Sequence, residues 1–287
     1  MGYYCSKVVL IKFRVVKKVL LLLHWLNFDT AIGAAITSLF IARNINTHVP
    51  VVAIAALALT VLAIYNFDHL LDAKQIKGVA STGRHKYYQE NFKWLSIYEL
   101  VLLVSLLIIT LFVPLEIVKA GIVLAVISLI YFLLLFIIMP NQFIFKEVVI
   151  ALVFVSGLFL SPLAISHDYD MTILFLWGQI FLLALANTFI FAWFDYEVDR
   201  QEGHTSLAQA LGKHKIYFLS LVILSILALT VIVDGFIMVN WENQLIISLM
   251  GVMLLLTLIL GKYTYHHELY RVVGEAIFLI PIIGLIW

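Results

Sequence analysis

The stretch on which the interpretation of this chain depends is DYEVDRQEGHTSLAQALGKHK, from Asp195 to Lys215. It follows Met171–Phe194, an apolar run that contains no charged residue and is long enough to span a membrane. Two carboxylates, Asp195 and Asp199, stand four residues apart where the run ends, and this spacing places them on one face of a helix. Because ionisable residues in membrane segments mark functional sites, the pair is a candidate cation site.

The composition places this stretch in a polytopic membrane protein. Of the 287 residues, 64% are hydrophobic and 12% are charged, whereas soluble domains are about half apolar and a quarter charged. Nine apolar runs are close to the roughly 20 residues that a spanning helix needs. We predict an all-α membrane protein with a single domain over residues 1–287 and nine transmembrane helices, at about 19–42, 49–67, 94–113, 117–139, 148–165, 171–194, 216–234, 243–261 and 272–287.

The positive charges predict how these helices are oriented. With the N-terminus in the cytoplasm, all of the 18 Lys and Arg residues except Arg43 and Lys119 fall in cytoplasmic segments. This bias follows the positive-inside rule. We therefore expect a multi-pass protein of the cell (inner) membrane with a cytoplasmic N-terminus, and with Asp195–Lys215 on the cytoplasmic side.

The remaining composition excludes several classes of protein. A net charge of +1 argues against a nucleic-acid partner, and the single cysteine, Cys5, excludes an internal disulfide. The first apolar run begins like a signal peptide, but Asn27 and Asp29 interrupt it and it continues to Ala42, which predicts an uncleaved helix. Asp29 is either an interfacial polar residue or one that faces a polar cavity. No segment indicates an obligatory protein partner.

A second carboxylate pair ends the second predicted helix. Asp68 and Asp72 are again four residues apart, and the same offset of 127 residues separates Asp68 from Asp195 and Asp72 from Asp199. The matched spacing predicts two repeats of about four helices, parallel to each other around a central cavity, because helices two and six run in the same direction. The segments that follow the pairs are also alike, with GRHK at 83–86 and GKHK at 212–215.

Four aspartates on one membrane face suit divalent cations. Mg²⁺ prefers oxygen ligands and usually joins one or two carboxylates to the phosphate oxygens of a substrate. Two such pairs suit a diphosphate that is bridged by two metal ions. The candidate diphosphate ligands are nearby cationic and polar side chains, with Arg contributing a bidentate fork: Asn66, Arg84, Lys146 and Arg200.

The segment after Asp199 is expected to contribute backbone donors. Gly203 can take the left-handed conformation and end the helix. Thr205 or Ser206 can then cap the next helix and leave backbone N–H groups to meet an anion.

This layout resembles the UbiA superfamily of intramembrane prenyltransferases. The resemblance lies in nine helices, a cytoplasmic N-terminus and two Asp-rich motifs that follow helices two and six. The second motif is the better match: the family pattern DxxxDxxxGxxT is met by Asp195, Asp199 and Gly203, with Ser206 in the Thr position.

The first motif departs from the family pattern NDxxDxxxD. When Asp68 and Asp72 are aligned with its last two acids, Ile64 and Tyr65 occupy the positions of the Asn and of the first Asp. One carboxylate of the family set is therefore missing from this chain.

The resemblance implies Mg²⁺-dependent transfer of a polyprenyl group from a polyprenyl diphosphate to an unidentified acceptor within the membrane. An aromatic compound or a quinone precursor is the expected acceptor. The implied metal ligands and catalytic residues are Asp68, Asp72, Asp195 and Asp199. The metal ions and basic residues would stabilise the leaving diphosphate, and exclusion of water would protect the allylic cation from hydrolysis.

Other functions remain open at this point. The chain is also compatible with a superfamily member that has altered or lost its catalysis, and each pair alone is compatible with solvated helix ends. A divalent-cation transporter would carry its acids near the middle of the bilayer. A CDP-alcohol phosphotransferase would need its acids in one continuous motif, whereas 127 residues separate the two pairs here.

Overall fold

Every regular element that the described residues form is a helix, which suits a membrane because a helix satisfies its backbone hydrogen bonds within one segment. The computed structural model describes residues 19–76, 78–133, 146–166, 170–203, 206–237, 241–264 and 268–286. After the helix Val19–Trp25, the elements are α2 (Phe28–Asn44), α3 (Val51–Gln75), α4 (Gly83–Glu90), α5 (Phe92–Thr110), α6 (Leu115–Leu133), α7 (Lys146–Ile165), α8 (Met171–Phe194), α9 (Tyr196–Glu202), α10 (Leu207–Leu211), α11 (Lys213–Ile237), α12 (Trp241–Ile259), α13 (Gly261–Thr264), α14 (Leu269–Ala276), η3 (Ile277–Leu279) and α15 (Ile282–Ile286).

Within the described ranges, seven spans are long and apolar enough to cross a membrane, or eight if the bent pair at the N-terminus counts as one. This pair joins Val19–Trp25 to α2 at an angle of 67°, and Asn27 at the break has a left-handed backbone with φ of 60°. The fourth predicted span corresponds to α6, but its second part, residues 134–139, lies outside the described residues. The multi-pass class is confirmed, and the count of nine stays a prediction.

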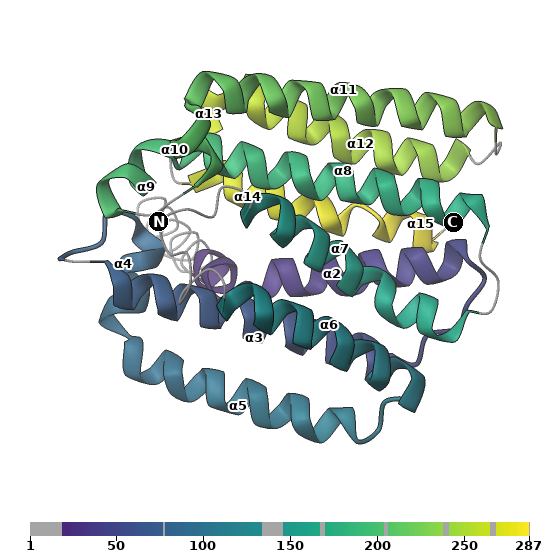
Figure 1. Cartoon of the computed structure of the whole chain (residues 1–287), viewed down its shortest axis with the longest axis horizontal. Helices are drawn as coiled ribbons and strands as arrows, with labels where there is room; N and C mark the ends of the chain where they lie inside the picture. Colours follow the sequence, from purple (N-terminus) through teal and green to yellow (C-terminus); the bar gives the residue numbers. More distant parts are fainter. Residues whose placement is uncertain are drawn as a thin grey trace, which may run out of the picture.

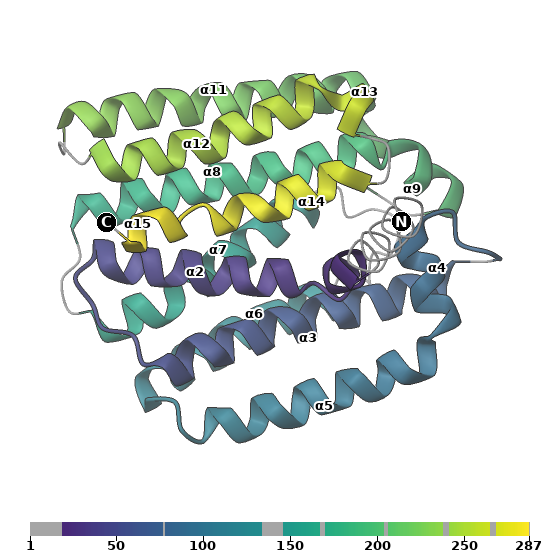
Figure 2. The ribbon, with the colours of Figure 1, turned by 180° about the vertical axis from the view of Figure 1, so that it is seen from behind.

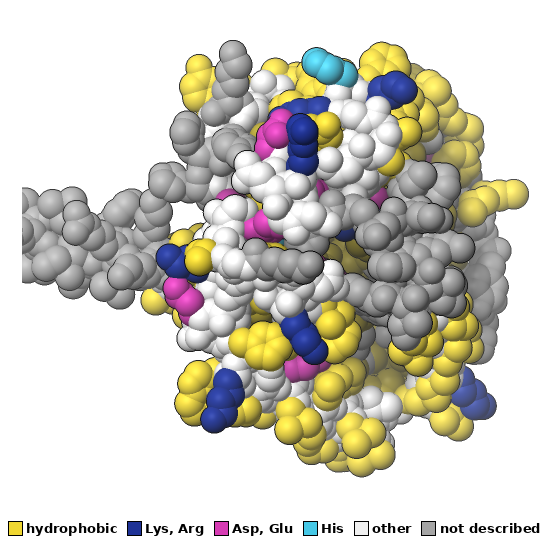
Figure 3. All heavy atoms as spheres, turned by 60° about the vertical axis from the view of Figure 1, so that its left-hand side comes forward, with side chains coloured by type: hydrophobic (Ala, Val, Ile, Leu, Met, Phe, Trp, Pro, Cys, Tyr) yellow, Lys and Arg dark blue, Asp and Glu magenta, His cyan; other side chains and the backbone are white. Residues whose placement is uncertain are grey.

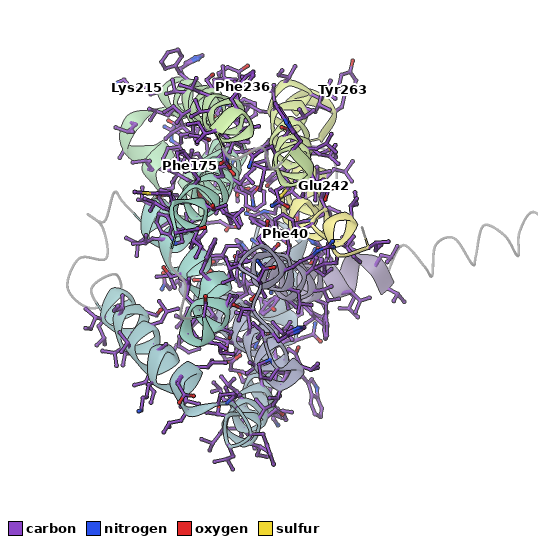
Figure 4. The ribbon with its side chains drawn as sticks, turned by 90° about the vertical axis from the view of Figure 1, so that its right-hand side faces the viewer. Phe40, Phe175, Lys215, Phe236, Glu242 and Tyr263 are labelled. Carbon is purple, nitrogen blue, oxygen red and sulfur yellow. The ribbon has the colours of Figure 1, made fainter. Side chains whose placement is uncertain are left out.

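The middle of the bundle is formed by α8, which packs against α7, α11 and α12. Its sequence is apolar all round and carries no charge, as is typical of a buried helix. Figure 4 looks along the bundle from one end and places Phe40 of α2 near the centre, where this residue is 1% exposed. By contrast, α5 and α6 expose apolar side chains such as Leu107 and Val123, as expected of surfaces that face lipid.

The short polar helices gather at one end of the bundle. The helices α4, α9 and α10 lie there, and α15 lies at the opposite end (Figure 1 and Figure 2). Both α3 and α8 terminate at this polar end, so the two carboxylate pairs lie on the same side of the molecule.

The two halves differ beyond the carboxylate pairs. The segment GRHK at 83–86 forms the first turn of the eight-residue helix α4. Gly212 instead caps the C-terminus of α10 with φ of 92°, and Lys213 starts the 25-residue helix α11. The two similar segments, GRHK and GKHK, therefore occupy different positions in the structure. The parallel repeat stays a prediction.

Candidate active site

The first carboxylate pair lies near the C-terminal end of α3. Asp68 and Asp72 are half-buried. One oxygen of each carboxylate and one ring nitrogen of His69 all lie within 4.8 Å of one another. Two carboxylates and an imidazole at this separation are able to bind one divalent cation. His69 was not among the site residues predicted from the sequence.

Arg84 approaches this pair from α4. Thr82 caps that helix by accepting a hydrogen bond from the backbone N–H of His85 at 3.2 Å, which fixes the turn that carries Arg84. This arginine is 7% exposed, its Nε has no hydrogen-bond partner among the described residues, and its charge interacts with that of Asp68. A buried guanidinium with an unused donor is suited to bind an anion.

The second pair has a different environment, because α14 engages Asp195. Tyr270 donates its hydroxyl to one carboxylate oxygen, and Arg271 donates its guanidinium to the other. The ring of Tyr270 stacks on Phe194 with centroids 4.3 Å apart, and Arg271 lies 5.3 Å over the ring of Phe191. Asp195 is 6% exposed, so a metal ion at this carboxylate would have to displace Arg271.

Asp199 lies half-buried in α9. Burial and the neighbouring charge of Asp195 raise the pKa of Asp199 to about 6, although Lys146 and Arg271 oppose this rise. A carboxyl with this pKa is largely ionised at pH 7. Asp199 therefore remains able to bind a cation.

The turn that follows α9 has the predicted conformation. Gly203 takes the left-handed conformation with φ of 78° at the end of α9. Ser206 caps α10 by accepting a hydrogen bond from the backbone N–H of Gln209 at 3.3 Å. Thr205, the other predicted cap, lies outside the described residues.

Two cations connect the two carboxylate pairs. The charges of Lys146 and Arg271 act on Asp68 and also on Asp199. Both aspartates therefore experience the charges of the same two side chains, at the end of the bundle where α3 and α8 terminate. Figure 3 shows basic and acidic side chains close together at this end of the molecule. In the sequence, Arg271 had stood out only as a positive charge of a cytoplasmic loop.

The other two predicted diphosphate ligands lie in different surroundings. Asn66 is 0% exposed. Its amide donates to Glu99 at 2.9 Å and to the carbonyl of Leu95 at 3.3 Å, and its oxygen accepts from the Tyr88 hydroxyl at 3.0 Å. These contacts join α3 to α4 and α5. Arg200 is exposed on α9, and diphosphate binding by Asn66 or Arg200 stays a prediction.

A hydrogen-bonded clasp of Ser81, His85 and Glu202 joins the segment after the first pair to the helix after the second. Glu202 accepts from the backbone N–H of Ser81 at 2.8 Å, from its hydroxyl at 2.5 Å and from Nδ1 of His85 at 2.8 Å. Burial by itself would raise the pKa of Glu202, but the bonds from His85 and Ser81 lower it to about 2. The clasp holds α4 beside α9 and closes the polar end.

A buried ionic cluster lies where the N-terminal helix is broken. Nδ1 of His24 is 2.6 Å from Asp29 and 3.3 Å from Glu275, and Thr30 donates to Glu275 at 2.9 Å. The charge of Glu275 also interacts with that of Arg84, so the cluster adjoins the first pair. Asp29 therefore contacts a buried histidine, and the polar cavity stays a prediction.

Comparison with known proteins bears on the fold. No family model and no curated protein sequence matches the chain. A solved structure of a digeranylgeranylglyceryl phosphate synthase in membranes superposes with a TM-score of 0.54, over 94% of this chain and 99% of that one. The chain has the fold of this synthase. The two sequences are 15% identical, so the match concerns the fold alone.

Proposed function

We propose that this protein is a membrane prenyltransferase that moves a polyprenyl group from a polyprenyl diphosphate to an acceptor. The chain shares its fold with the digeranylgeranylglyceryl phosphate synthase, which supports this proposal. The observation that carries it is that α3 and α8 end on the same side of the bundle (Figure 1), where the charges of Lys146 and Arg271 influence both Asp68 and Asp199. Acids and cations arranged around one region are what a metal-bound diphosphate requires.

The donor atoms at this end of the bundle suit a divalent cation. Asp68 and Asp72 bring oxygens within 4.8 Å of each other, and Asp199 adds a half-buried carboxylate. These residues would hold Mg²⁺ together with phosphate oxygens, and the metal would stabilise charge on the leaving group as a Lewis acid. Asp195 would join the set of ligands if Arg271 exchanged it for the diphosphate.

The basic residues would then act on the leaving group. The bond between C1 of the prenyl chain and the diphosphate oxygen breaks, and both electrons stay on the diphosphate. Arg84, Lys146 and Arg271 balance the added negative charge, Arg through paired hydrogen bonds. C1 forms its new bond to the acceptor, whose proton is released, and the surrounding apolar helices keep water from the cation.

The alternatives and the acceptor can be separated by experiment. A cation transporter would need acids in the middle of the bundle, whereas these pairs lie where α3 and α8 end (Figure 1), which favours the enzyme. The acceptor is proposed to be an aromatic compound or a quinone precursor. The name of the structural neighbour adds a prenylated glyceryl phosphate as a third class to test.

The proposal is tested with purified protein in lipid nanodiscs, Mg²⁺, radiolabelled geranylgeranyl diphosphate and three acceptors: a hydroxybenzoate, a dihydroxynaphthoate and geranylgeranylglyceryl phosphate. We expect a labelled product with one of them. Asp199→Asn should lower the rate by about 100-fold or more, because a metal ligand contributes several kcal/mol. Glu197→Gln, which changes an exposed acid of the same helix, is the matched control and should keep the rate. No product with any acceptor, or full activity of Asp199→Asn, contradicts the proposal.

A further inference from the structure

The first metal site contains a residue that the Asp-rich pattern does not include. Tyr65 occupies the position of the missing carboxylate. His69 places a ring nitrogen within 4.8 Å of the carboxylate oxygens of Asp68 and Asp72. A nitrogen donor therefore lies beside the two carboxylates of the motif from which the third is missing.

The hydrogen bonds of His69 determine which nitrogen is available. With the Asn27 amide in this orientation, its Oδ1 lies 3.3 Å from Nε2 of His69 and accepts from it, which assigns the proton to Nε2. Nδ1 then holds the lone pair. It is buried and has no hydrogen-bond partner among the described residues. A metal-binding histidine typically donates its other N–H to an oxygen in this way, which fixes its tautomer.

The ring of His69 is also held in place. It meets Tyr88 edge to face with centroids 5.2 Å apart and Tyr65 with centroids 6.5 Å apart, and the residue is 4% exposed. Asn27 itself is fixed at the break in the N-terminal helix. A histidine that only filled space would not leave a buried acceptor unpaired, because such atoms nearly always have partners.

We propose that His69 is the third protein ligand of the divalent cation held by Asp68 and Asp72, and that this site prefers Mn²⁺ to Mg²⁺. Mg²⁺ favours an all-oxygen shell, whereas imidazole favours transition-metal ions. The inference rests on the proposed function for its biological meaning. Metal binding can nevertheless be measured without any prenyl substrate.

The test is pulsed electron paramagnetic resonance of Mn²⁺ bound to the purified full chain, which detects nitrogen bonded directly to the metal. We expect a ¹⁴N coupling in the wild type and in His214→Gln, a control that removes an exposed histidine outside the donor set. His69→Gln should abolish the coupling and weaken Mn²⁺ binding by about tenfold or more. His69→Asp should retain the ion without the coupling and bind Mg²⁺ more tightly than the wild type does.

Several outcomes would overturn the inference. They are a wild-type Mn²⁺ signal without nitrogen coupling, a coupling that survives His69→Gln, and tighter binding of Mg²⁺ than of Mn²⁺. The test is independent of turnover. Prenyl transfer together with an all-oxygen metal shell would refute ligation by His69 and leave the proposed function intact. Nitrogen-bound Mn²⁺ without prenyl transfer would support ligation by His69 and refute the proposed function.

Discussion

Gly274 of α14 packs closely against α8, beside the contact that α14 makes with Asp195. Gly274→Ala should push α14 and α8 apart. A Cβ at this position would lie 2.3 Å from Oδ1 of Asn187 and 2.5 Å from Cε1 of Phe191. The Asn187 side chain can rotate away. The Phe191 ring cannot move freely, because Tyr270 packs edge to face on it at 6.0 Å and Arg271 lies over it.

Two opposing effects determine how much Gly274→Ala changes the free energy of unfolding. Overpacking a tight contact costs about 1–3 kcal/mol, whereas Ala in place of Gly stabilises a helix by about 0.5–1 kcal/mol. The clash should prevail, and Gly274→Ala should lower stability by about 1–2 kcal/mol, a fall in Tm of about 2–8 °C. Displacement of Phe191 should also loosen Arg271 and weaken diphosphate binding.

The assay is thermal unfolding in detergent, followed by tryptophan fluorescence, together with equilibrium binding of geranylgeranyl diphosphate. Gly178→Ala in α8 is the matched control, because its Cβ would have no neighbour within 4 Å, and it should be neutral or slightly stabilising. Equal stability and equal diphosphate binding of the two variants would refute this account of the contact between α8 and α14.

Three further predictions concern the residues around the site. Arg271→Ala leaves the charge of Asp195 buried and should cost about 3–5 kcal/mol in denaturant unfolding, whereas exposed Arg200→Ala should stay within about 0.5 kcal/mol; a similar small effect of both would contradict the ion pair. Asn66→Ala leaves the buried carboxylate of Glu99 without this donor and should cost about 1–3 kcal/mol; unchanged thermal unfolding would argue against that network. Glu202 should stabilise the fold fully above its ordinary pKa of 4.5, and this contribution should disappear as the pH falls towards its folded-state pKa of about 2, because protonation breaks the clasp. Glu202→Gln should remove that pH dependence of Tm, and an unchanged profile would contradict the clasp.

The apolar runs and the spacing of acids predicted the features that depend on local sequence. An apolar run of about 20 residues spans a membrane as a helix, so the class and most helix positions followed directly. The common end of α3 and α8 followed from counting spans between Asp72 and Asp195. The left-handed Gly203 and the Ser206 cap followed from turn chemistry.

Tertiary contacts made by the last helices could not be predicted in the same way. Tyr270 and Arg271 meet Asp195 across 75 and 76 residues of sequence, and Glu275 meets Thr30 across 245. No spacing rule connects such positions. These contacts change how the two motifs compare, because the second matches the family pattern better, yet its Asp195 is held by Arg271.

The central claim is that both carboxylate pairs act on one diphosphate. Equilibrium binding of radiolabelled geranylgeranyl diphosphate to wild type, Asp72→Asn, Asp199→Asn and the double variant tests it most directly, with a saturating divalent cation. If one bridged diphosphate contacts both pairs, each single variant should lose most of the affinity and the double variant should lose little more, because coupled sites are not additive. Additive losses, or full affinity in either single variant, would show that the two pairs do not share a ligand.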